Sequence, residues 1–165
     1  MAKNDLTAAR VRELFNYNSE TGALTWAFNV GPTARVGGIA GSLEKKGYRS
    51  IGVDGSYYKA HRLIWLHVTG QWPIGQIDHK DGDKDNNRWD NLRDVTSTVN
   101  QQNKRAAVAS NRSCGLLGVT PNRKRWKTSI CIDGVKRHLG TFDTAEEAHA
   151  VYLAAKRKHH EGCTI

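Results

Sequence analysis

The sequence lacks several features that would assign it to whole classes of protein. No apolar run approaches 18 residues, which argues against a transmembrane helix. The first five residues lack the apolar core of a signal peptide. The three cysteines, Cys114, Cys131 and Cys163, are odd in number and form no C-x-x-C pair, which argues against a disulfide framework and a zinc cluster. These absences predict a cytoplasmic protein with free thiols and no membrane contact.

Nucleotide-binding loops and repeats are also missing. The glycine-rich stretch 29–46 contains no G-x-G-x-x-G pattern and resembles no phosphate loop, so we expect a surface loop there. There is no internal repeat and no low-complexity tract. The chain is long enough for two small domains or one medium one.

Charge is present in excess and is unevenly placed. The net charge is +9 over 165 residues. Residues 1–103 hold 13 Lys and Arg against 11 Asp and Glu, whereas residues 104–165 hold 12 against 5, a net charge of +7. A basic C-terminal third indicates binding to nucleic acid or to another acidic surface.

The first half of the sequence alternates short helices and strands. Val11, Leu14 and Phe15 share one face of an expected helix that Thr7 caps. Asp54-Gly55 is a strong hairpin signal between two β-runs. His61 and His67 lie at helical spacing among apolar residues, which favours structural over catalytic roles. The elements expected are a helix over 6–16, strands over 23–28, 48–53 and 57–60, and a helix over 61–70.

The second half predicts a separate small unit. We expect a linker over 106–115, followed by strands over 116–120, 125–132 and 135–141 with a hairpin turn at Asp133-Gly134. Thr144-Ala-Glu-Glu147 is a capping box that opens a helix running to about His160. The expected fold of this unit is a three-stranded antiparallel sheet packed on one helix.

The stretch 76–93 carries the chemistry. Asp78 and His79 precede a loop too rich in Asp, Asn and Gly to form a core. A helix expected over 96–107 presents Asn100 and Asn103 on one face. An imidazole, a carboxylate and amide oxygens together suit metal-assisted cleavage of a phosphodiester.

Two simpler interpretations of this loop are weaker. Asp81, Asp83 and Asp85 match positions one, three and five of an EF-hand, but Asn86 replaces the glycine at position six and Leu92 replaces the glutamate at position twelve. A solvated turn without function would favour Asp and Asn, yet it would not need the adjacent Asp-His pair.

Over residues 10–105 the sequence resembles the HNH endonucleases, in particular phage and intron-homing forms. The motifs are His61-Arg-Leu-Ile-Trp, Ile77-Asp-His-Lys-Asp-Gly, Asp85-Asn-Asn-Arg, Asn91-Leu-Arg and Asn100. The resemblance implies a ββα-metal fold with one Mg²⁺ or Mn²⁺ ion. It implies His79 as general base, Asp78 and Asn100 as metal ligands, and Asn91 as a catalytic-site residue that pins the loop. Asn103 and Lys104 would either clamp the DNA backbone or solvate the helix end.

Residues 115–160 resemble the APETALA-type DNA-binding domain of plant ethylene-response factors. The specific motif is Leu139-Gly-Thr-Phe-Asp-Thr-Ala-Glu-Glu-Ala148, supported by Gly118-Val119 and Trp126. In that family the sheet enters the major groove, and several arginine and tryptophan base readers are absent here. Strand parity directs Trp126, Thr128, Ile130 and Ile132 toward the helix. The side chains then expected to contact DNA are Arg123, Arg125, Lys127, Ser129, Lys136 and His138.

We therefore predict an α+β protein with a nuclease domain over 1–105, a linker over 106–115 and a DNA-binding domain over 116–165. The predicted activity is metal-dependent, homing-type hydrolysis of double-stranded DNA, by a monomer in the bacterial host cytoplasm if the gene is phage-borne. The alternatives are a DNA-binding regulator with an inactive core and, more distantly, an RNA-cutting enzyme. The target site and the choice between a nick and a double-strand break stay open.

Overall fold

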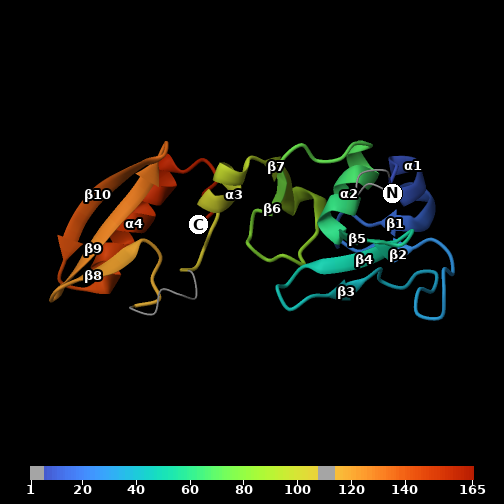
Figure 1. Ribbon diagram of the computed structural model, residues 1–165, viewed down its shortest axis with the longest axis horizontal. Helices are drawn as coiled ribbons and strands as arrows, with labels where there is room; N and C mark the ends of the chain where they lie inside the picture. The colour runs from blue at the N-terminus through green and yellow to red at the C-terminus, as the bar shows by residue number, and fades with distance from the viewer. Residues whose placement is uncertain (1–5, 108–113) are drawn as a thin grey trace. The chain divides into compact units, whose positions relative to one another are not determined.

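The computed structural model describes residues 6–107 and 114–165, which belong to two compact units, Met1–Thr96 and Ser97–Ile165 (Figure 1). Both mix short helices with small antiparallel sheets, so the α+β class predicted from the sequence is confirmed. Among the described residues, no helix is both long and apolar enough to cross a membrane. The central part of the expected linker, 108–113, lies outside the described residues.

The first unit begins with a capped helix and two antiparallel ribbons. Thr7 accepts a hydrogen bond from the backbone of Arg10, as predicted, and opens the helix. Asp54 and Gly55 both have positive φ, the backbone that a two-residue hairpin requires, so the predicted turn is confirmed. The elements are α1 (Ala8–Leu14), β1 (Phe15–Tyr17), β2 (Leu24–Trp26), β3 (Ser42–Leu43), β4 (Arg49–Val53), β5 (Ser56–Lys59) and α2 (Ala60–Thr69).

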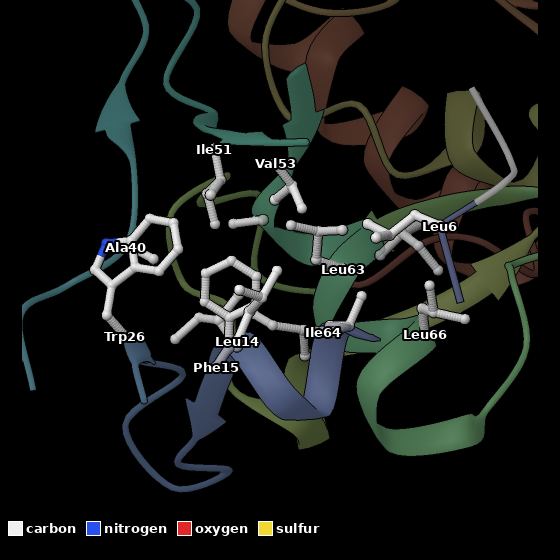
Figure 2. Close-up of a cluster of buried hydrophobic side chains, with 14 of the residues drawn as sticks. Leu6, Leu14, Phe15, Trp26, Ala40, Ile51, Val53, Leu63, Ile64 and Leu66 are labelled. Carbon is white, nitrogen blue, oxygen red and sulfur yellow. The ribbon is translucent and has the colours of Figure 1, made fainter. Parts of the chain in front are cut away.

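The core of the first unit lies between these ribbons and α2. Leu63 and Ile64 of α2 are fully buried, and side chains from α1, β1 and β4 converge on them (Figure 2). Ile77 and Leu92 extend the same core to a further antiparallel ribbon, β6 (Gln76–His79) paired with β7 (Leu92–Val95). A short 3₁₀ turn, η1 (Trp89–Asn91), leads into β7. The core therefore anchors the ribbon that carries Asp78 and His79.

The second unit starts with α3 (Ser97–Gln102), continues with β8 (Val119–Asn122), β9 (Arg125–Ile132) and β10 (Val135–Phe142), and ends with α4 (Ala145–His159). The sheet order is β10-β9-β8, all antiparallel, and α4 packs on one face (Figure 1). Thr144 and Glu147 form both hydrogen bonds of the predicted capping box. Asp133 and Gly134 have positive φ and form the predicted hairpin turn.

Several boundaries differ from those expected. The helix expected over 6–16 spans only Ala8–Leu14, and Phe15, expected on its apolar face, is instead the first residue of strand β1. The helix expected over 96–107 spans only Ser97–Gln102, because 3₁₀-type hydrogen bonds from Asn103 to Asn100 and from Lys104 to Gln101 close its last turn. The strand expected over 116–120 lies at Val119–Asn122. The two compact units divide after Thr96, whereas the first domain was expected to end at residue 105. Helix α3 therefore groups with the C-terminal sheet.

Candidate active site

The β6–β7 ribbon presents the Asp-His pair at its end. Asp78 lies opposite Arg93, and His79, the last residue of β6, lies opposite Leu92. Neighbouring strand residues point to opposite faces. If both side chains are to reach one phosphate, the strand therefore has to end or bend at this pair, and β6 ends at His79.

His79 is almost fully buried, and its tautomer follows from its partner. Its Nε2 lies 3.1 Å from Oδ1 of Asn87, while Nδ2 of Asn87 donates to the backbone oxygen of Asp85. An amide oxygen only accepts, so Nε2 of the neutral ring carries the proton. Nδ1 then carries the lone pair that a general base needs.

A second histidine packs against His79. The ring of His61, from α2, stands edge-on to it with centroids 5.2 Å apart, and Tyr48 lies against both rings. Burial, followed by the charge of His79, lowers the pKa of His61 to about 3. His61 is thus a neutral packing partner at physiological pH, in keeping with the structural role expected for it.

Asn91 ties together the polar loop over 80–91. Its side chain accepts from the backbone of Asp81 at 3.0 Å and donates to the Asp81 carboxylate at 2.9 Å and to the Asn86 carbonyl at 2.7 Å. Although burial alone would raise the pKa of Asp81, hydrogen bonds from Asn86 and Asn91 hold it below its usual range. These are interactions of the loop-pinning kind expected of Asn91.

The loop is also braced from outside. Arg49 of β4 donates to both carboxylate oxygens of Asp85, at 3.0 and 2.9 Å. The Tyr17 hydroxyl donates to the backbone oxygen of Asn87 at 2.8 Å. The turn between β1 and β2 touches the same place, since a Cβ on Gly22 would lie 2.5 Å from the backbone of Asn87 and Arg88. Asn87, which binds His79, is therefore itself held by β1 and by the turn between β1 and β2.

Asp78 is the expected metal ligand in this unit. It is 6% exposed, and Arg93 donates to its Oδ2 through Nε at 2.9 Å and Nη2 at 2.7 Å. Within the described residues, no group of three or more His, Cys, Asp and Glu side chains gathers as a metal site. A carboxylate with one amide oxygen still fits Mg²⁺, which binds proteins through few oxygen ligands and keeps several waters.

The other expected residues of the motif lie on or after α3, in the second unit. Asn100 is on α3, which follows β7 after a single residue. Because Asn100 and Asp78 belong to different units, their binding to one metal ion stays a prediction. Asn103 is only 6% exposed, and its Oδ1 accepts a hydrogen bond from Thr164. Asn103 therefore packs within the second unit and does not solvate the helix end, and its contact with DNA stays a prediction. Lys104 is exposed, and its backbone oxygen accepts from Lys156.

The sheet of the second unit separates its two faces as strand parity predicted. Thr128 and Ile130 are buried beneath α4, whereas Lys127 and Cys131 are exposed. The cross-strand pairs place Lys136 beside Cys131 and His138 beside Ser129. We call the face away from α4 the outer face; its side chains are Lys127, Ser129, Cys131, Lys136 and His138.

Two expected DNA contacts lie at the edge of this face. Arg123 is exposed in the β8–β9 turn with φ of 54°. Arg125 is ion-paired with Asp143 at 2.7 Å, both largely exposed. Exposed pairs of this kind are weak, so a phosphate can replace the Asp143 carboxylate.

Sequence reasoning did not single out Asn87, Arg93 or Tyr48. Asn87 and Arg93 fall inside the motifs Asp85-Asn-Asn-Arg and Asn91-Leu-Arg, so the sequence marked both residues but indicated no role for either. Nothing in the local sequence of Tyr48 indicates its place beside His79, because that contact joins segments about 30 residues apart.

An imidazole whose tautomer suits proton abstraction, directly after a buried carboxylate in the sequence, can serve metal-assisted hydrolysis. Residues 58–102 match the model of the HNH endonuclease family. DNA endonuclease I-HmuI of Bacillus phage SP01 is 30% identical over 135 residues, which cover 74% of this chain and 78% of that protein. The chain belongs to the HNH endonuclease family and is an endonuclease, as its motifs indicated.

Two further likenesses accompany these matches. Protein 3.8 of Escherichia phage T7 is 26% identical over 107 residues, covering 62% of this chain and 88% of that protein. A solved structure of DNA binding and cleavage by the HNH homing endonuclease I-HmuI covers 90% of this chain and 88% of its own, with a TM-score of 0.43 and 23% identity. The APETALA-type resemblance of residues 115–160 stays a prediction.

Proposed function

We propose that this protein is a divalent-metal-dependent, homing-type DNA endonuclease acting in the cytoplasm of a bacterial host. The observation that carries the proposal is His79, which directly follows Asp78 in β6 and is held by Asn87 in the tautomer of a general base. Its relative of phage SP01 is named a DNA endonuclease, and that substrate agrees with the excess positive charge of this chain.

The chain's own residues divide the work. His79 takes a proton from the attacking water through Nδ1 while Nε2 stays bonded to Asn87. Asp78 and Asn100 would hold one Mg²⁺ or Mn²⁺ ion. When bound, the ion supplies Lewis-acid stabilisation of the charge that develops on the phosphate. Asn91 keeps the loop over 80–91 folded so that Asn87 stays under the imidazole.

The second unit would position the enzyme on double-stranded DNA, as an APETALA-type sheet does. Its outer face displays Lys127 and Lys136, with Arg123 in the adjoining turn. Most of the net charge belongs to this part of the sequence, +7 of +9 over residues 104–165. A single active site cuts one strand per visit, so a monomer would favour nicking.

A DNA-binding regulator with an inactive core is the second candidate. The observation that favours it is the Arg93 guanidinium, which donates twice to Oδ2 of Asp78 and so competes with a cation there. For an active enzyme, the cation has to share or displace this contact.

A cleavage assay separates the two candidates. Supercoiled plasmid carrying candidate target DNA is incubated with the protein in Mg²⁺, in Mn²⁺ and in EDTA. Cleavage with either cation and none in EDTA supports the nuclease, and binding without cleavage under all three conditions supports the regulator.

The ligand roles are tested in the same assay. Asp78→Ala and Asn100→Ala should each raise the half-saturating metal concentration, whereas Asn91→Ala should mainly lower the thermal stability of the unit. Wild-type metal dependence in both ligand variants would refute the assignment.

A further inference from the structure

Helix α3 has little to hold it in place by itself. It is six residues long, and none of its residues is buried. Isolated helices of this length are unstable in water, because forming the first turn costs more than its few hydrogen bonds return. Its stability must therefore come from groups that contact it or the turn that follows it.

Several such groups come from the other end of the unit, from residues 162–165, which we call the return segment, and from α4. The backbone nitrogen of Gly162 donates to Oε1 of Gln102 at 3.0 Å. The Thr164 hydroxyl donates to Oδ1 of Asn103 and accepts from Arg105 at 2.7 Å. Each contact joins residues about 60 positions apart in the sequence.

A buried lysine adds a fourth contact. Lys156 of α4 is fully buried, and its ammonium donates to the backbone oxygen of Lys104. Burial lowers the pKa of Lys156. Burying a cation is costly unless it is hydrogen-bonded, so this bond joins α4 firmly to the turn after α3.

The return segment is fixed in turn to α4. The backbone nitrogen of Cys163 donates to the carbonyl of His160 at 3.0 Å, and Arg157 donates to the carbonyl of Ile165 at 3.0 Å. The fit against α3 is close, since a Cβ on Gly162 would lie 2.1 Å from the carbonyl oxygen of Val99.

We propose that the return segment and Lys156 are positioning elements of the nuclease, because they fix the helix that carries Asn100 to the DNA-reading sheet. The proposal rests on the metal-ligand role proposed for Asn100. It makes the placement of Asn100 a property of the second unit.

Thr164 offers a matched pair of variants in the full chain. Thr164→Val keeps the shape of the side chain and removes the hydroxyl's hydrogen bonds with Asn103 and Arg105, whereas Thr164→Ser keeps the hydroxyl. Gly162→Ala has its own control in Gly31→Ala, since a Cβ on Gly31 meets nothing within 4 Å and neither glycine has positive φ.

Three quantities are measured for each variant: hydrogen exchange of the α3 amides, the half-saturating Mg²⁺ concentration for cleavage, and duplex affinity in EDTA. Thr164→Val and Gly162→Ala should speed α3 exchange and raise the half-saturating Mg²⁺ about 10-fold, the size seen when residues that orient metal ligands are removed. Duplex affinity should stay at the wild-type value, and Thr164→Ser and Gly31→Ala should behave as wild type.

Wild-type α3 exchange in both test variants would overturn the proposal. Faster hydrogen exchange of α3 with an unchanged half-saturating Mg²⁺ concentration would also overturn it, because loosening α3 would then have no effect on metal binding. Asn100→Ala is assayed in the same experiment. If its half-saturating Mg²⁺ concentration equals that of wild type, Asn100 is not a metal ligand and the proposed function itself fails in this part.

Discussion

At the scale of single residues, the site depends on one hydrogen bond that fixes a tautomer. His79→Ala should reduce cleavage by about 10²–10⁴-fold, the usual contribution of a general base, with duplex binding unchanged. Asn87→Ala removes the acceptor for Nε2 and allows the proton to move to Nδ1, so it should reduce cleavage by about 10- to 100-fold, as variants of residues that orient functional histidines do.

Single-turnover rates across pH check both expectations. The Asn87→Ala profile should change shape, because the population of the productive tautomer changes, whereas a purely structural loss would lower the profile uniformly. Wild-type cleavage by His79→Ala would remove His79 from the mechanism.

His61 makes a separate prediction about stability and pH. Its folded-state pKa is about 3, whereas in an unfolded chain a histidine titrates near its ordinary value of about 6.5. Between these values the unfolded chain binds more protons, so stability is complete above the upper value and falls as pH decreases below it. The slope from this one group approaches about 1.4 kcal/mol per pH unit.

Denaturant unfolding at several pH values between about 6.5 and about 4.5, inside the window set by the two pKa values, measures this slope. His61→Phe should flatten it, and His159→Gln, at an exposed position of α4, should leave it as in wild type. An equal slope in His61→Phe and wild type would show that His61 is not the group responsible.

At the scale of elements, the turn between β1 and β2 supports the catalytic loop. Gly22 and Gly37 have nearly the same backbone, φ of 76° and 75°, so alanine at either position costs about 1–2 kcal/mol of left-handed strain. Only at Gly22 does the new Cβ meet the backbone of Asn87 and Arg88, at 2.5 Å.

Gly22→Ala should therefore lose more stability than Gly37→Ala, and it alone should lower the cleavage rate by displacing Asn87. Thermal unfolding and cleavage rates of the two variants test this. Equal cleavage rates would show that the turn does not support the loop.

The elements that the sequence predicted well are those with local causes. The Asp54-Gly55 and Asp133-Gly134 turns and the Thr144–Glu147 capping box depend on residues within four positions of each other. The packing of His61 and Tyr48 around His79 was not predictable in this way, because it joins three separate elements. The assignment of α3 to the second unit depends on contacts about 60 residues away, which no local pattern encodes.

At the scale of the whole molecule, charge is expected to set the salt dependence of binding. Lys127 and Lys136 lie on the outer face of the sheet. Replacing a lysine that neutralises one phosphate should reduce the slope of log affinity against log salt by about 0.9, so the double variant to Ala should reduce it by about twice that amount. Lys158→Ala, an exposed change on α4, should leave the slope unchanged.

Binding to target and random duplexes across a salt series provides the measurement. If removing the two outer-face lysines changes neither affinity nor slope, the outer face is not the DNA-binding surface.

The division of the chain after Thr96 has a consequence for how such enzymes exchange parts by recombination. A crossover at Thr96 would transfer α3 together with Gly162, Thr164 and Lys156, the residues that hold it. A crossover near residue 105 would pair α3 of one parent with the return segment and α4 of another. The hydrogen bonds of Gly162, Thr164 and Lys156 would then form only if the two parents happened to have compatible residues. Hybrids joined at the first position should cut DNA more often than those joined at the second. In such a lineage, Asn100 would be inherited together with the C-terminal sheet.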